Sequence, residues 1–110
     1  MASKADTKHI WYMINKIAKA RNVEPNEIYL WAVQQIVPLK NFSVPNKIAD
    51  DFIEFWTSKG TGFVAEKKEV VGNETHMIIG AGMTSFYDEQ IEELKQLLIN
   101  TAWENQIPLD

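Results

Sequence analysis

Hydrophobic residues recur at helical spacing near the start of the chain. When successive residues are placed about 100° apart, five apolar side chains fall on one stripe, as expected for a helix with one buried face. They are Ile10, Met13, Ile14, Ile17 and Ala20. Ser3 or Asp6 offers a side chain that can cap the first turn. The pattern predicts a first helix from this cap to about Arg21.

Two further helices are predicted before residue 60. Pro25 suits the first turn of a second helix, which is apolar on most sides and ends at Pro38. The segment from Lys40 to Pro45 is predicted to be a connector. Asn46 then caps a third helix, which Lys59-Gly60 closes. Its apolar positions are Ile48, Ala49, Phe52, Ile53 and Trp56.

The pattern changes from helical to extended after Gly60. Residues 63–65 and 70–71 are apolar, Gly72-Asn73 is typical of a tight turn, and residues 75–79 follow, so the spacing predicts two strands of a β-hairpin. Gly80-Ala81-Gly82 ends the hairpin. This triplet lacks the lysine of a phosphate-binding loop and the third glycine of a dinucleotide turn, so we interpret it as a joint.

A last helix is predicted up to Pro108, with Ser85 as its cap and Asp88 at the third position. Its apolar stripe consists of Tyr87, Ile91, Leu94, Leu98 and Ala102. The predicted fold is therefore α+β and mainly helical, with three helices followed by a β-hairpin and a C-terminal helix. No repeat or linker divides the chain, so a single domain over residues 1–110 is expected.

Composition narrows the class of protein. The 110 residues are 45% hydrophobic, which is enough for the core of one domain. The chain has no cysteine, which excludes a disulfide framework, a thiolate zinc site and a cysteine nucleophile. No apolar run is long enough for a signal peptide or for the roughly 20 residues that span a bilayer, so we expect a cytoplasmic protein without a membrane partner.

Large apolar side chains are numerous for a chain of this size. A small domain leaves much of its surface uncovered, so part of this apolar content is expected at a subunit contact. The residues concerned include Trp31, Phe55, Trp56 and Trp103. A homo-oligomer is therefore predicted.

Charge is unevenly placed along the chain. The net charge is −4, yet residues 1–21 hold five basic residues against one acidic residue, a local +4. The remaining residues hold six basic and fourteen acidic residues, which gives −8. The chain is thus bipolar, and its two parts suit different partners.

The lysines of the first segment gather on the face of the first helix that lies opposite the apolar stripe. Lysines can meet phosphates, and aromatic rings can stack on bases; Tyr12 lies within this face and Trp11 beside it. An ordinary solvated helix, in which Tyr12 covers lysine stems, is the alternative. The predicted nucleic-acid-binding residues are Lys4, Lys8, Tyr12, Asn15, Lys16 and Lys19.

Acidic residues gather at the start of the last helix. Asp88, Glu89, Glu92 and Glu93 favour the positive end of the helix dipole, which explains them without a function. A partner that presents lysines or arginines could use the same face. Together with the −8 balance after residue 21, this gives an alternative function, an acidic protein-interaction module or an inhibitor whose surface occupies the nucleic-acid site of an enzyme.

No set of residues predicts an active site. The two histidines, His9 and His76, fall on different elements without paired-ligand spacing, and no nucleophile elbow is present. Residues 66–68, Glu-Lys-Lys, with Asp50 and Asp51 upstream, share the D…E-x-K layout of many metal-dependent nucleases, but such triplets are common in charged hairpins. We therefore predict a protein that is not an enzyme and needs no cofactor and no metal.

Two segments carry a resemblance to a known family. The first is Thr7 to Ala18 followed by residues 23–28, Val-Glu-Pro-Asn-Glu-Ile, and the second runs from residues 83–88, Met-Thr-Ser-Phe-Tyr-Asp, to residues 103–109. Their pattern resembles the phage recombination family of NinB/Orf type. The family's S-x-x-Q-N opening and its preceding strands have no counterpart here. The resemblance implies an accessory role in phage DNA recombination, with single-stranded DNA or its binding protein as partner.

Overall fold

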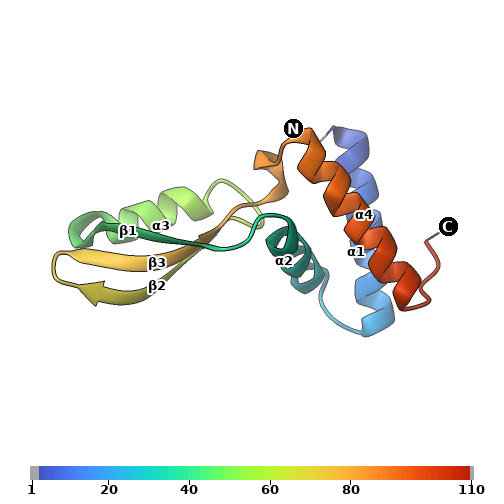
Figure 1. Ribbon diagram of the computed structural model, residues 1–110, viewed down its shortest axis with the longest axis horizontal. Coiled ribbons are helices and arrows are strands. Elements are labelled where there is room, and N and C mark those ends of the chain that lie inside the picture. Colours follow the sequence, from blue (N-terminus) through green and yellow to red (C-terminus); the bar gives the residue numbers. More distant parts are fainter. Residues whose placement is uncertain (1–2, 110) are drawn as a thin grey trace.

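The computed structural model describes residues 3–109, which form four helices and a three-stranded antiparallel sheet. The predicted α+β, mainly helical class is confirmed. The molecule is elongated, with extents of 53 × 27 × 18 Å and a radius of gyration of 16.0 Å, whereas a compact chain of this length would have about 13 Å. Figure 1 shows why: a helical lobe carries a protruding arm.

The helical lobe consists of α1 (Lys4–Arg21), α2 (Pro25–Ile36) and α4 (Asp88–Glu104). Ser3 and Asp6 form a capping box at the start of α1, and Asn22 ends this helix in the left-handed conformation. Both predicted capping residues thus act together. The apolar stripe of α1 is buried as predicted, except that Ala18 takes the place of Ala20, which is exposed.

The three helices enclose one apolar core. Its fully buried side chains from α1 and α4 are Ile10, Met13, Ile14, Ile17, Ile91, Leu94, Leu98 and Ala102. The predicted cap of the last helix is wrong, because Ser85 lies in the 3-10 turn η2 (Met83–Ser85) and α4 begins three residues later. There the Gln90 side chain accepts a hydrogen bond of 2.8 Å from the Tyr87 N–H. Tyr87, placed in the core stripe by the sequence, is 76% exposed.

The β-arm consists of β1 (Lys40–Pro45), η1 (Asn46–Ile48), α3 (Ala49–Thr57), β2 (Val64–Val71) and β3 (Glu74–Gly80). The strand order is β1-β3-β2, all antiparallel. The predicted hairpin is confirmed as β2 and β3, with Gly72 at positive φ in its turn. Helix α3 packs beside the sheet (Figure 1) over a small cluster of buried Val44, Ala49 and Met77.

The prediction of a connector between Lys40 and Pro45 is wrong. This segment is an edge strand whose pairing with β3 runs from Lys40 opposite Ile79 to Pro45 opposite Glu74. The segment forms a strand because Val44 is buried in the small cluster with Ala49 and Met77, which requires the segment to lie against the sheet. Proline at the end of an edge strand costs no ladder hydrogen bond.

Asn46 does not cap the third helix as predicted, since α3 begins at Ala49. The Asn46 side chain instead binds the hairpin. Its amide donates to the Gly72 carbonyl at 3.0 Å, and its carbonyl oxygen accepts from the Thr75 hydroxyl at 2.7 Å. Asn46 thereby fixes the start of the α3 segment to the tip of the β2–β3 hairpin.

Three segments, residues 37–39, 58–63 and 81–87, join the lobe to the arm and form a neck. The Tyr29 hydroxyl of α2 accepts a hydrogen bond from the Met83 N–H at 2.9 Å and donates to the Thr61 carbonyl at 3.2 Å. Burial raises the pKa of this hydroxyl, and the hydrogen bond from Met83 partly opposes the rise. Tyr29 therefore ties two of the three neck segments to the helical lobe.

Candidate nucleic-acid interface

The outer face of α1 brings together all six residues that the sequence singled out. We call this set the basic face: Lys4, Lys8, Tyr12, Asn15, Lys16 and Lys19, all of them exposed. At 1.5 Å of rise per residue, the face extends for about 22 Å. Among residues 3–109, no carboxylate forms an ion pair with these four lysines. Their charges are therefore available to a polyanion.

Tyr12 lies between the lysines of the basic face and is 40% exposed. The Lys16 ammonium lies 5.6 Å from the centre of the Tyr12 ring, a cation–π contact. This contact is the arrangement expected of an ordinary solvated helix. It also places one positive charge next to one aromatic surface, which is the pairing that a nucleotide requires.

Trp11, predicted beside the basic face, is turned toward α2. Its ring stacks on that of Tyr29 with the centroids 4.7 Å apart and an interplanar angle of 21°. The side chain is partly buried against the lobe core. One face of the Trp11 ring is therefore covered by Tyr29, and Tyr12 is the more exposed of the two aromatic side chains.

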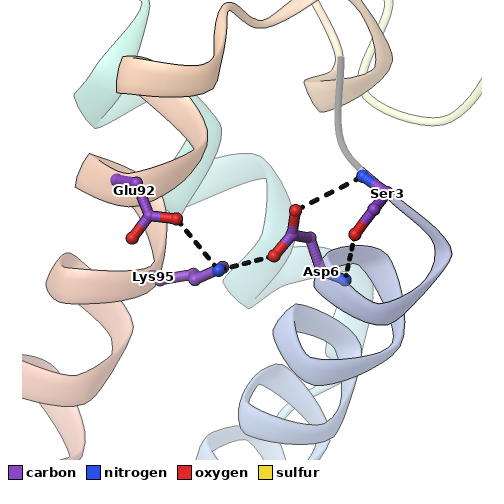
Figure 2. Close-up of polar contacts among 4 residues, drawn as sticks. All are labelled: Ser3, Asp6, Glu92 and Lys95. Carbon is purple, nitrogen blue, oxygen red and sulfur yellow. Dashed lines mark hydrogen bonds and ion pairs between the residues drawn. The ribbon is translucent and has the colours of Figure 1, made fainter.

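Asp6 is the one acidic residue of the first 21, and its carboxylate points toward α4 (Figure 2). Its carboxylate pairs with the Lys95 ammonium of α4 at 2.5 Å, and Lys95 also contacts Glu92 at 3.0 Å. The hydrogen bond from Lys95, followed by those from Ser3, holds the pKa of Asp6 below its ordinary value. The same contact with Asp6 raises the pKa of Lys95. This network joins α1 to α4.

Replacing Asp6 with asparagine is expected to destabilise the protein at pH 7 and not at pH 2. A carboxyl group whose pKa is depressed by folding contributes stability above its unfolded pKa, and that contribution is lost as the pH falls through the folded pKa. The ordinary pKa of Asp6 is 3.8, so the loss begins near pH 4 and is complete below the depressed value. Urea denaturation of parent and variant between pH 2 and pH 7 measures the difference.

Glu93→Gln is the matched control for this experiment, because Glu93 is exposed on the same helix, α4, as Lys95. It is expected to change stability little at any pH, since isolated surface charges contribute little. A constant difference between the Asp6→Asn variant and the parent across the whole pH range would show that the carboxylate does not act through its charge.

Acidic residues occupy other surfaces. The outer side of α4 presents Glu89, Glu92, Glu93 and Glu104, all exposed. The acidic side of α3 is also exposed, and its Asp50 pairs with Lys67 of β2 at 2.5 Å. Glu66 pairs with Lys68 at 3.1 Å. The D…E-x-K residues are thus engaged in surface ion pairs, and within residues 3–109 no three acidic or histidine side chains come together as metal ligands.

A hollow at the neck was not predicted from the sequence. It lies between the end of α3 and η2 and has a volume of about 480 Å³. Its lining comes from two segments more than twenty residues apart, so neither segment alone shows a motif. The lining residues are Trp56, Lys59, Phe63, Thr84 and Ser85.

No protein-family model matches the chain, and neither a curated protein nor a solved structure shows significant similarity to it. The resemblance to the phage recombination family stays a prediction. Among residues 3–109, no helix is both long enough and apolar enough to cross a membrane.

Proposed function

We propose that the protein binds nucleic acid through the basic face of α1 and acts by binding rather than by catalysis. The observation that carries this proposal is the exposed stripe of four lysines and one tyrosine, whose ammonium groups have no carboxylate partner within residues 3–109. Lysines that neutralise phosphates release condensed counterions, which drives binding without regard to sequence.

Single-stranded DNA is the ligand that this face suits best. A base can stack on an aromatic ring only where it is not already stacked in a duplex, and Tyr12 offers such a ring between Lys8 and Lys16. The resemblance to the NinB/Orf type implies an accessory role in phage DNA recombination, in which single-stranded DNA is the expected partner. A single-strand-binding protein is the other partner that the resemblance implies.

Replacing Lys8, Lys16 and Lys19 with glutamine is expected to weaken binding to all sequences and to reduce its salt dependence. Each phosphate contact on a single strand contributes about 0.7 to the slope of log affinity against log salt, so the slope should fall by about two. Fluorescence anisotropy with a labelled oligonucleotide across a salt series measures both effects. Tyr12→Ala should cost a further 1–3 kcal/mol or so on single strands.

A triple glutamine variant of Lys40, Lys47 and Lys68 is the charge-matched control. These lysines lie on the β-arm and are exposed, so the net charge changes equally while the basic face is intact. The control should bind nearly as well as the parent. Equal weakening by both triple variants would show that net charge alone matters, and a parent that binds no DNA at any salt would contradict the proposal.

A second candidate function is docking to a basic protein partner through the outer face of α4, as an interaction module or an inhibitor of a nucleic-acid-binding enzyme. Trp103 on this face is 83% exposed, and Ile99, one turn before it, is 39% exposed. Exposed aromatic residues next to acidic side chains such as Glu104 are typical of interaction surfaces. This candidate is preferred if the parent has no DNA affinity.

We also propose that the protein self-associates. Three of the four large side chains predicted at a subunit contact, Trp31, Phe55 and Trp103, are 41%, 60% and 83% exposed. Trp56 is the exception, because its indole N–H donates to the Gly80 carbonyl at 2.8 Å inside the arm. Light scattering at a protein concentration of tens of micromolar should give the mass of a dimer or a larger assembly. A monomer mass would contradict the prediction.

A further inference from the structure

The hollow at the neck has the size and the wall of a small-ligand site. Its volume of about 480 Å³ falls within the range of roughly 300–1,000 Å³ that is usual for such pockets. Trp56 and Phe63 form its aromatic wall with their rings edge to face, at 5.6 Å and 76°. Phe63 is buried behind Trp56, so the half-buried Trp56 is the aromatic side chain that a ligand in the hollow would contact.

The aromatic wall is held in place before any ligand arrives. The Trp56 indole donates its N–H to the Gly80 carbonyl at 2.8 Å. The Phe52 ring stacks on the Trp56 ring, with their centroids 6.0 Å apart. Phe63 is only 7% exposed and is fixed by its neighbours. A prepared surface of this kind lowers the conformational entropy lost on binding.

The rim of the hollow is cationic and hydroxyl-bearing. The Lys59 ammonium lies 4.7 Å from the centre of the Phe55 ring and 5.8 Å from that of Trp56. It has no carboxylate partner among the residues that the structure describes. Thr84 is exposed and its hydroxyl can donate to a ligand, whereas the Ser85 hydroxyl already donates to the Gly82 carbonyl at 2.9 Å.

We propose that this hollow binds one nucleotide unit, with its base against the exposed part of Trp56 and its phosphate at Lys59 and the Thr84 hydroxyl. A base is flat, and a phosphate needs a cation and donors, so the wall and the rim match the two parts of one ligand. The inference rests on the proposed function where the nucleotide belongs to a DNA strand. A free mononucleotide has the same chemistry.

The position of the hollow suits a strand that also contacts the basic face. Ser85 lies three residues before the start of α4, and Lys95 of α4 pairs with Asp6 in the first turn of α1. Figure 1 shows η2, which supplies Thr84 and Ser85 to the lining, near the end of the helical lobe where α1 begins.

Photo-crosslinking tests the site directly. An oligo(dT) with a single 5-iododeoxyuridine is irradiated with the full-length protein, and the modified peptide is identified by mass spectrometry. A crosslink at Trp56 supports the inference, since the iodinated base reacts with the aromatic ring that it touches. Crosslinks at Tyr12 without any at the neck would overturn it.

Titration with thymidine monophosphate separates the hollow from the basic face. Lys59→Gln should weaken its binding at least threefold, whereas the triple glutamine variant of Lys8, Lys16 and Lys19 should bind it as the parent does. Lys47→Gln, another exposed lysine of the arm, is the control and should have no effect. Equal binding of thymidine monophosphate by the parent and the Lys59→Gln variant would contradict the inference.

The two proposals fail in different ways. If the parent binds oligonucleotides through α1 but neither crosslinking nor Lys59→Gln reports the hollow, the inference is wrong and the proposed function stands. If thymidine monophosphate binding depends on Lys59 while no oligonucleotide binds, the hollow is a mononucleotide site and the proposed function is wrong. If the parent binds neither probe, both are wrong.

Discussion

Replacing Gly82 with alanine is expected to lower the free energy of unfolding by about 3 kcal/mol, the upper part of the range for overpacked sites. A Cβ at this position would overlap the Thr61 carbonyl oxygen and would lie 2.9 Å from the Phe63 ring. The carbonyl belongs to the backbone of another neck segment, so it cannot rotate away as a side chain would. Thermal unfolding followed by circular dichroism should show a midpoint lower by roughly 10–15 °C.

Gly72→Ala is the matched control for Gly82→Ala. Gly72 has φ of +62° in the hairpin turn, and a Cβ there meets nothing within 4 Å. The control therefore measures backbone strain alone, about 1–2 kcal/mol. Gly82 has an ordinary negative φ of −84°, so its cost arises from crowding. If Gly82→Ala destabilises no more than Gly72→Ala, the close packing of residues 61 and 82 is contradicted.

The helices of the lobe could be predicted because each carries its own signal. The stripe of α1 repeats over about two turns, Pro25 stands in the first turn of α2, and the stripe of α4 runs from Ile91 to Ala102. Local spacing is sufficient when one helix face is buried along its whole length. The burial of Ala18 in place of Ala20 depends on how the three helices pack together, which a single helix wheel does not contain.

The strand β1 could not be predicted from local pattern. Its alternation covers only Phe42 and Val44, and its partner β3 begins some thirty residues later. The division of the buried apolar residues into two clusters, one in the lobe and one in the arm, could not be predicted from composition either. Asn46 was predicted as a helix cap because local pattern does not contain its actual partners. Its hydrogen bonds to Gly72 and Thr75 join residues far apart in the sequence.

The candidate site also has a part that local pattern predicts and a part that it does not. The basic face could be predicted since its six residues belong to one helix, where angle alone determines which side chains lie together. The packing of Trp11 on Tyr29 and the hollow lined by Lys59 and Thr84 depend on contacts between elements. A sequence predicts the first kind of site and not the second.

Replacing Tyr29 with phenylalanine is expected to cost about 2–4 kcal/mol, because a buried polar group that loses its partner costs roughly 1–3 kcal/mol. The variant keeps the ring that stacks on Trp11 but leaves the Met83 N–H without its acceptor and the Thr61 carbonyl without its donor. Urea denaturation measures the loss. Hydrogen exchange should show faster exchange at the Met83 amide.

Tyr87→Phe is the control for this substitution, since Tyr87 is 76% exposed. It should change stability by no more than about 0.5 kcal/mol. Protection of the Met83 amide that is equal in the parent and in Tyr29→Phe would contradict the role of the Tyr29 hydroxyl in joining the neck to the lobe.

The pH dependence of the Tyr29→Phe effect provides a second measurement, independent of hydrogen exchange. Burial raises the pKa of Tyr29 above its ordinary value of 10.0, so its contribution is fully present below pH 10 and is lost as the pH rises further. The phenylalanine variant has no such group. The stability difference between parent and variant should therefore shrink above pH 10. Lys95, whose pKa is also raised, is common to both proteins and cancels in this comparison.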